Sequence, residues 1–162
     1  MTFSILKKTL ILGASIWIMV GCSSGKMMHD GKMMHTNMET TLYERLGGKA
    51  AIEAVVEDFV NRLATDKRIK NEKVAARFGV VHVPSLRTHL VNLICAGAGG
   101  PCKYTGRDMK SAHAGLEITH PEFNFVVEDL IAALNKFNVP EKEKGEVLAL
   151  LGPMQKDIVE KP

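Results

Sequence analysis

Four stretches of apolar residues repeat at three- and four-residue spacing, and this pattern limits the fold more than any other feature of the chain. Such spacing places the apolar side chains on one face of an α-helix. No segment alternates with period two for long enough to demand a sheet, so we predict an all-α fold. The stripes are Ile52, Val55, Val56, Phe59, Val60 and Leu63; Leu86, Leu90, Leu93 and Ile94; Phe123, Val126, Val127, Leu130, Ile131, Leu134 and Phe137; and Val147, Leu148, Leu151, Met154 and Ile158.

Prolines and glycines mark where these helices begin and end. Proline suits the first turn of a helix, because its missing N–H would have no partner there, and glycine is common where a helix stops. The first helix is predicted from about Lys49 to Thr65, and the next two open at Pro84 and Pro121. The fourth begins at about Glu141, after Pro140. Glycines expected to end helices are Gly47, Gly48 and Gly97.

A long segment between the second and third helices lacks a helical stripe. It runs from Pro101 to Thr119 and holds many glycine and polar residues, apart from one or two predicted helical turns near Met109 to His113. Irregular segments of this length inside a compact domain usually carry a binding function. We therefore expect functional residues here.

The N-terminus has the pattern of an export signal. Lys7 and Lys8 precede an uncharged apolar run from Thr9 to Val20, which is followed by small residues. This run is shorter than the roughly 20 residues that cross a bilayer as a helix. We therefore predict a cleaved signal peptide at residues 1–21, a tether at residues 22–40 and one folded domain at residues 41–162.

The end of that run, from Met19 to Cys22, resembles the lipoprotein box of bacteria. Lipidation of Cys22 would hold the protein on a membrane of the cell envelope, facing the periplasm, because more than one acyl chain gives stable anchoring. The alternative is a soluble periplasmic protein in which Cys22 has no role.

Charge and cysteine content narrow the possible partners. The chain has 21 basic and 18 acidic residues, and these nearly balance once Lys7 and Lys8 are removed with the signal. Nothing here predicts nucleic-acid binding. Cys95 and Cys102 would face an oxidising compartment after export, so a disulfide between them is possible, although the sequence alone does not assign it.

The predicted tether contains a short repeat, in which Gly25 to His29 and Gly31 to His35 have the same order of residue types. Thioether and imidazole groups suit copper, above all Cu(I), so the repeat is a candidate for weak copper binding. A flexible tract loses entropy when it closes around a metal, so a methionine-rich spacer is the preferred interpretation.

The histidines are the strongest candidates for chemistry in the folded domain. His113 closes the short turn that begins at Met109, and His89 lies on the apolar face of the second helix, where an unpaired imidazole would be costly. A buried structural histidine with a backbone partner remains open for His89. Spacings typical of zinc sites, covalently attached haem and phosphate loops are missing.

Two runs resemble one known family. Leu42 to Gly48, followed by Phe59, resembles the opening of group I truncated haemoglobins, and the run from Gly99 through Tyr104, Gly106, Met109 and His113 to Gly115 resembles their centre. The resemblance covers residues 41–159. It implies a shortened globin in which two helices pack over two around a b-type haem.

The resemblance also implies roles for individual residues. His113 matches the proximal histidine that binds the haem iron, and Phe78 and Phe123 match pocket residues. His89 falls where some members place a distal histidine, which binds the iron or hydrogen-bonds a bound gas. The remaining residues expected to line the haem are Phe59, Leu86, Leu90, Tyr104, Met109, Ile118 and Val126.

Three positions depart from the family pattern. Val60 stands where many members have a tyrosine that donates a hydrogen bond to bound oxygen. Extra residues lie between Ile69 and Phe78, so the match of Phe78 requires a gap. No histidine stands near Met154 or Gln155, where some members bond covalently to haem.

We therefore predict a haem protein that reversibly binds oxygen, nitric oxide or carbon monoxide, served by an unidentified reductase. Nitric-oxide oxidation is a conceivable activity, but a gas binder is favoured over a dedicated enzyme. Two alternatives stay open. One is a redox or sensing protein in which His89 and His113 both bind iron, and the other is an envelope lipoprotein that binds copper through the Met/His repeat.

Overall fold

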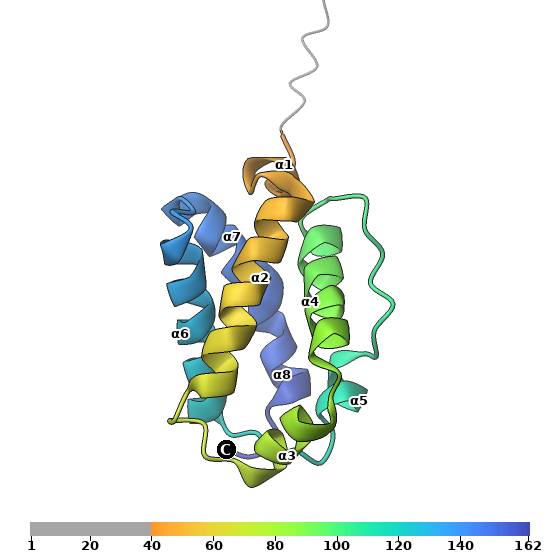
Figure 1. The fold of residues 1–162 in the computed structure, drawn as a ribbon, viewed down its shortest axis with the longest axis vertical. Coiled ribbons are helices and arrows are strands. Elements are labelled where there is room, and N and C mark those ends of the chain that lie inside the picture. Colours follow the sequence, from red (N-terminus) through yellow and green to blue (C-terminus); the bar gives the residue numbers. More distant parts are fainter. Residues whose placement is uncertain (1–39) are drawn as a thin grey trace, which may run out of the picture. The chain divides into compact units, whose positions relative to one another are not determined.

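The computed structural model describes residues 40–162, and the predicted signal peptide, Cys22 and the Met/His repeat lie outside this range. The described chain is helical, which confirms the predicted fold class (Figure 1). No helix within residues 40–162 is long and apolar enough to cross a membrane. The elements are α1 (Leu42–Arg45), α2 (Gly48–Thr65), α3 (Glu72–Val80), α4 (Val83–Gly97), α5 (Met109–His113), α6 (His120–Lys136), α7 (Glu141–Leu151), the 3₁₀ turn η1 (Gly152–Met154) and α8 (Gln155–Ile158).

Four helices form two antiparallel pairs, the two-over-two arrangement that the resemblance implied (Figure 1). Chain direction reverses from α2 to α4 in one pair and from α6 to α7 in the other, and α2 packs against both α4 and α6. The stripes on these helices meet in one core. Its least exposed members include Val56, Val60, Ala133, Leu134 and Val147.

Local signals begin and end the first helices where the sequence predicts. Thr41 and Glu44 form a capping box, in which each side chain bonds the other residue's backbone N–H, so α1 has a defined start. Gly47 and Gly48 then take φ values of 91° and 76°, which residues with a Cβ rarely adopt. The glycine pair therefore separates α1 from α2.

The predicted fourth helix is one continuous stripe to Ile158, and this part of the prediction is wrong. Helix α7 ends at Leu151, and the chain continues through η1 into the short α8. Pro153 is the cause, because it lacks a backbone N–H and its ring clashes with the carbonyl of the preceding turn. The residues after Leu151 therefore lie outside the regular helix α7.

Helix α3 was not predicted, although it occupies the extra residues after Ile69. The side chain of Asn71 caps it by accepting hydrogen bonds from the backbone N–H groups of Lys73 and Val74, at 3.0 and 3.3 Å. An asparagine at this position satisfies donors that an isolated helix end would leave unpaired. The insertion therefore forms a helix that carries Phe78.

Cys95 and Cys102 form a disulfide with a Cα separation of 5.7 Å. Cys95 lies near the end of α4 and Cys102 at the start of the irregular segment that leads to α5. The segment runs back beside α4 (Figure 1). The bridge, which the sequence left unassigned, therefore ties the beginning of this segment to the helix that carries His89.

Candidate functional site

His113 closes α5, and its ring is held by the same short helix. Asp108 begins α5 by accepting hydrogen bonds from the N–H and hydroxyl of Ser111, at 2.9 and 2.6 Å, and these bonds lower the pKa of Asp108. The Nδ1 atom of His113 lies 2.8 Å from the carbonyl oxygen of Met109. A carbonyl only accepts, so Nδ1 carries a proton, and in the neutral imidazole Nε2 is then the nitrogen with the free lone pair.

His89 is oriented differently. Its ring lies edge-on to that of Tyr104, with centroids 6.2 Å apart and planes at 74°. Its Nδ1 atom is buried and has no hydrogen-bond partner among the residues that the structure describes. The alternative in which His89 is a structural histidine with a backbone partner at this atom is therefore not observed, and packing rather than a hydrogen bond at Nδ1 holds the ring.

Tyr104 is fixed by the segment around it. Its hydroxyl donates a hydrogen bond to the carbonyl oxygen of Arg107 at 2.5 Å, and burial raises the pKa of the phenol. A Cβ at position 106 would stand 2.4 to 2.8 Å from the Tyr104 ring, closer than side-chain atoms approach. Gly106 therefore allows the chain to fold closely over the ring.

The helix α3, which carries Phe78, has no buried residue, yet polar contacts fix its start. Asn71 donates from its side-chain amide to the carbonyl oxygen of Leu116 at 2.9 Å, and so joins α3 to the segment that follows His113. Asn71 therefore links the two elements that carry Phe78 and His113.

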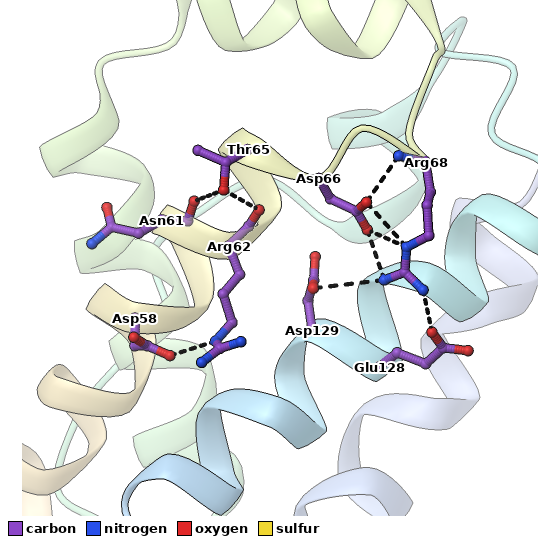
Figure 2. A network of polar contacts seen from close by, with 8 residues as sticks. All are labelled: Asp58, Asn61, Arg62, Thr65, Asp66, Arg68, Glu128 and Asp129. Carbon is purple, nitrogen blue, oxygen red and sulfur yellow. Dashed lines mark hydrogen bonds and ion pairs between the residues drawn. The ribbon is translucent and has the colours of Figure 1, made fainter.

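A charged network just before α3 holds the same region onto α6 (Figure 2). The guanidinium of Arg68 binds the carboxylates of Asp66 and Glu128 and lies 3.8 Å from that of Asp129. It also lies over the ring of Phe125 at 4.6 Å. These ion pairs raise the pKa of Arg68, whereas burial raises that of Asp129. The network defines where the chain leaves α2.

The C-terminal residues close over the segment after His113. The carboxylate of Glu160 accepts hydrogen bonds from the backbone N–H groups of Gly115 and Glu117, at 2.9 and 2.6 Å, which lowers its pKa. Glu117 pairs with Lys161 and with Lys73 of α3, both at 2.6 Å, and these two ammonium groups hold the pKa of Glu117 at about 2. Helix α3, the His113 region and the C-terminus are thus joined.

The predicted haem-lining residues come from several elements around this region. Phe59 on α2 and Ile118 after α5 are buried, and Leu90 and Val126 pack against the core from α4 and α6. Most of the set is half-buried, and so are His89 and His113. The half-buried members are Phe78, Leu86, Leu90, Tyr104, Met109, Phe123 and Val126.

An apolar cavity of about 160 Å³ lies elsewhere, among the core residues of α2, α4, α6 and α7. Its lining includes Ile52, Val55, Leu134 and Val147, but none of the predicted site residues. A cavity without a donor atom for iron is not the site, even though a large apolar pocket is the usual first choice. The histidines identify the candidate site instead.

The residues present fit a haem. The Nδ1–H of His113 already has a hydrogen-bond partner, as in a histidine that binds iron through Nε2. His89 adds a second imidazole with an unpaired buried nitrogen, and the surrounding side chains are mainly apolar. No cluster of three metal-ligating side chains occurs in residues 40–162. The donor set therefore suits an iron held by the haem itself.

Sequence reasoning missed three residues that position this site, namely Arg68, Asn71 and Glu160. Asn71 had a readable signal, because asparagine followed by an acidic residue commonly starts a helix. Arg68 and Glu160 had none, since their partners are distant in the chain.

Val60, the departure from the family pattern, is buried in the core with 1% of its surface exposed.

Comparison with known proteins gives consistent matches. The profile of bacterial-like globins matches residues 41–160. The group 1 truncated hemoglobin GlbN of Synechocystis sp. is 38% identical over 117 residues, which cover 70% of this chain and 90% of that protein. The protein of the same name from Mycolicibacterium paratuberculosis is 34% identical over 118 residues, covering 73% and 83%.

Solved structures give the same result. The truncated hemoglobin of Tetrahymena pyriformis in its Fe(III) form has a TM-score of 0.67 and 27% identity, covering 74% of this chain and 98% of that one. The 2/2 hemoglobin of Synechococcus sp., in the cyanomet state with covalently attached heme, has a TM-score of 0.65 and 28% identity over the same shares. The folded domain therefore resembles these proteins in both sequence and fold.

Proposed function

Because the chain belongs to the family of bacterial-like globins, we propose that it reversibly binds oxygen, nitric oxide or carbon monoxide at a haem iron held by His113. The chain is a haem-binding truncated haemoglobin. The observation that carries the residue assignment is the 2.8 Å contact between His113 Nδ1 and the Met109 carbonyl oxygen, because it prepares Nε2 as the donor atom.

A bound haem would supply an iron that His113 could hold and that could bind a gas. The protein's own residues set what happens around that iron. Val60 and Phe59 on α2 are buried and would help to keep water from the haem, and the resemblance assigns His89 on α4 to the side on which a gas would bind. With valine at position 60, His89 would be the side chain able to donate a hydrogen bond to a gas at the haem or to compete with that gas for the iron. Competition of His89 for the iron would favour electron exchange and sensing.

The binding of haem is proposed to be noncovalent. The Synechococcus hemoglobin has covalently attached heme. This chain has methionine and glutamine at positions 154 and 155, where the resemblance would require a histidine. We therefore expect an organic acid–ketone extraction to remove haem completely from the denatured protein.

The decisive test is haem binding by the purified domain and its histidine variants. Residues 23–162 with wild-type sequence are expected to show a Soret band when haem is supplied, and His113→Ala is expected to lose it or to bind haem only weakly. His82→Ala is the matched control, because His82 is exposed at the start of α4 and should leave the spectrum unchanged. A wild type without a Soret band would overturn the proposed function.

Export to the cell envelope and lipidation at Cys22 are a second part of the proposal. The Cys95–Cys102 disulfide supports export, because structural disulfides persist mainly in oxidising compartments. Cells that express the whole chain are expected to place lipid-labelled protein in the membrane fraction, and Cys22→Ser should abolish the label. A labelled Cys22→Ser protein, or an uncleaved and unlabelled wild type, would contradict lipidation.

A further inference from the structure

We propose that Tyr104, anchored by the Cys95–Cys102 disulfide, is a positioning residue that holds the His89 ring ready to bind the haem iron. This inference rests on the proposed function, because it concerns the second axial position of the same haem.

The two histidines are oriented in different ways. A histidine that binds a metal is normally oriented by a hydrogen bond at its other ring nitrogen. His113 has that bond, to the carbonyl oxygen of Met109. His89 has none at its buried Nδ1 within residues 40–162. Its orientation must therefore come from packing, and the Tyr104 ring at 6.2 Å provides an edge-to-face contact.

The disulfide attaches the segment of Tyr104 to the helix that carries His89. Cys95 lies six residues after His89 on α4, a rise of about 9 Å along the axis. Its disulfide partner Cys102 lies two residues before Tyr104, so the extended chain between them spans at most about 7 Å. The bridge thus keeps Tyr104 within reach of α4 although the intervening segment is irregular.

The side chain of Tyr104 is itself held by contacts with the residues that follow it. Its hydroxyl is bound to the carbonyl oxygen of Arg107, and Gly106 lets the chain pass close to the ring. The ring is therefore held from both directions along the chain, by the disulfide before it and by Gly106 and Arg107 after it. A side chain held this way can restrict the ring it touches.

A restricted His89 loses less conformational freedom when it binds iron, so its ligation is favoured over that of a mobile ring. We expect wild-type protein to contain a measurable fraction of six-coordinate low-spin haem that His89→Ala converts to the five-coordinate form. Tyr104→Leu is expected to lower the equilibrium constant for His89 ligation about three- to tenfold, which corresponds to the usual strength of an aromatic pair.

The experiment compares absorption spectra and carbon-monoxide rebinding after photolysis for wild-type holoprotein and its variants. Tyr104→Leu should lower the six-coordinate fraction and speed carbon-monoxide binding. Tyr104→Phe keeps the ring edge but loses the hydrogen bond to the carbonyl oxygen of Arg107, so its six-coordinate fraction should lie between those of wild type and Tyr104→Leu. Phe137→Leu is the control for loss of an aromatic side chain, since Phe137 follows α6 and is 41% exposed. It should change neither quantity.

A double-mutant cycle tests the role of the disulfide. Replacing both Cys95 and Cys102 with alanine should shift ligation in the same direction as Tyr104→Leu, and the combined variant should add little to Tyr104→Leu alone. Additive shifts would show that the bridge acts by another route and would overturn that part of the inference.

The outcomes also separate this inference from the proposed function. Failure of the wild type to bind haem overturns both. A wild type that binds haem but remains five-coordinate, or a Tyr104→Leu variant with unchanged or increased His89 ligation, overturns the inference and leaves the haem-binding function intact.

Discussion

The core of the domain and the region around the two histidines are stabilised in different ways. Helices α2, α4, α6 and α7 meet through buried aliphatic side chains, several of which are under 3% exposed. Neither α3 nor α5, which carry Phe78 and His113, contains a buried residue. These short helices are held instead by Asn71, Arg68 and Glu160, through hydrogen bonds and ion pairs.

Folding and cofactor binding therefore depend on separate sets of contacts. Apolar burial contributes most of the free energy of folding, so the core can form the domain on its own. Exposed ion pairs contribute little to folding, but they can fix where a helix lies. Substitutions in the two regions should therefore affect different measurements.

The largest expected effect comes from the core. Leu134 on α6 is 2% exposed, so Leu134→Ala should lower the free energy of unfolding by about 2 to 5 kcal/mol, through lost burial and a new cavity. Urea unfolding of the haem-free protein measures this change. Leu86→Ala on α4 is the comparison, because Leu86 is half-buried and should cost clearly less. Equal losses at both positions would contradict the separation of core and site.

Phe78 should show the opposite pattern, with a small effect on folding and a larger effect on haem binding. Phe78 lies on α3 and is half-buried, so Phe78→Ala should lower the unfolding free energy of the haem-free protein by about 1 kcal/mol or less. Haem should dissociate roughly tenfold faster, because the variant loses an apolar contact worth about 1.4 kcal/mol. Transfer of haem to excess apomyoglobin measures the rate. An unchanged rate would place Phe78 outside the haem pocket.

Much of this division could be predicted from the sequence. The apolar stripes predicted α2, α4, α6 and the start of α7, because core helices bury one face and the spacing shows it. Helix α3 was missed since its residues pack against little of the protein and its apolar stripe is short. The helical turn from Met109 to His113 was predicted correctly, and the resemblance suggested His113 within it as the residue that binds iron.

The contacts that position the site could not be predicted. Arg68 meets Glu128, Asn71 meets Leu116 and Glu160 meets Gly115, and each pair joins segments that are far apart in the chain. No spacing rule connects such residues before the fold is known. The approach of Tyr104 to His89 is of the same kind, since it depends on the path of an irregular segment.

A smaller effect is expected from Arg68, the centre of the network before α3 (Figure 2). Arg68→Gln removes the pairs with Asp66 and Glu128 and should let the start of α3 shift, so that haem dissociates a few-fold faster. High salt should speed dissociation from the wild type more than from the variant, because salt screens the exposed pairs. Lys67→Gln, at an exposed neighbouring position, is the control for loss of one positive charge. An equal effect of both substitutions would assign the change to net charge alone.

The smallest effect is expected on the retention of haem at acidic pH. The pKa of Glu117 is about 2 in the folded protein, lowered from 4.5 by Lys161 and Lys73. A carboxyl whose pKa falls on folding stabilises the folded state above its unfolded pKa, and this contribution is lost as the pH falls from about 4.5 toward 2. Glu117→Gln removes the titration, so its haem retention should be slightly lower at neutral pH and should decline less steeply over that interval. The two proteins share every other titratable group, so the difference between their Soret titrations isolates Glu117. Superimposable titrations would show that the Glu117 bridge between α3 and the C-terminus does not help to hold the haem.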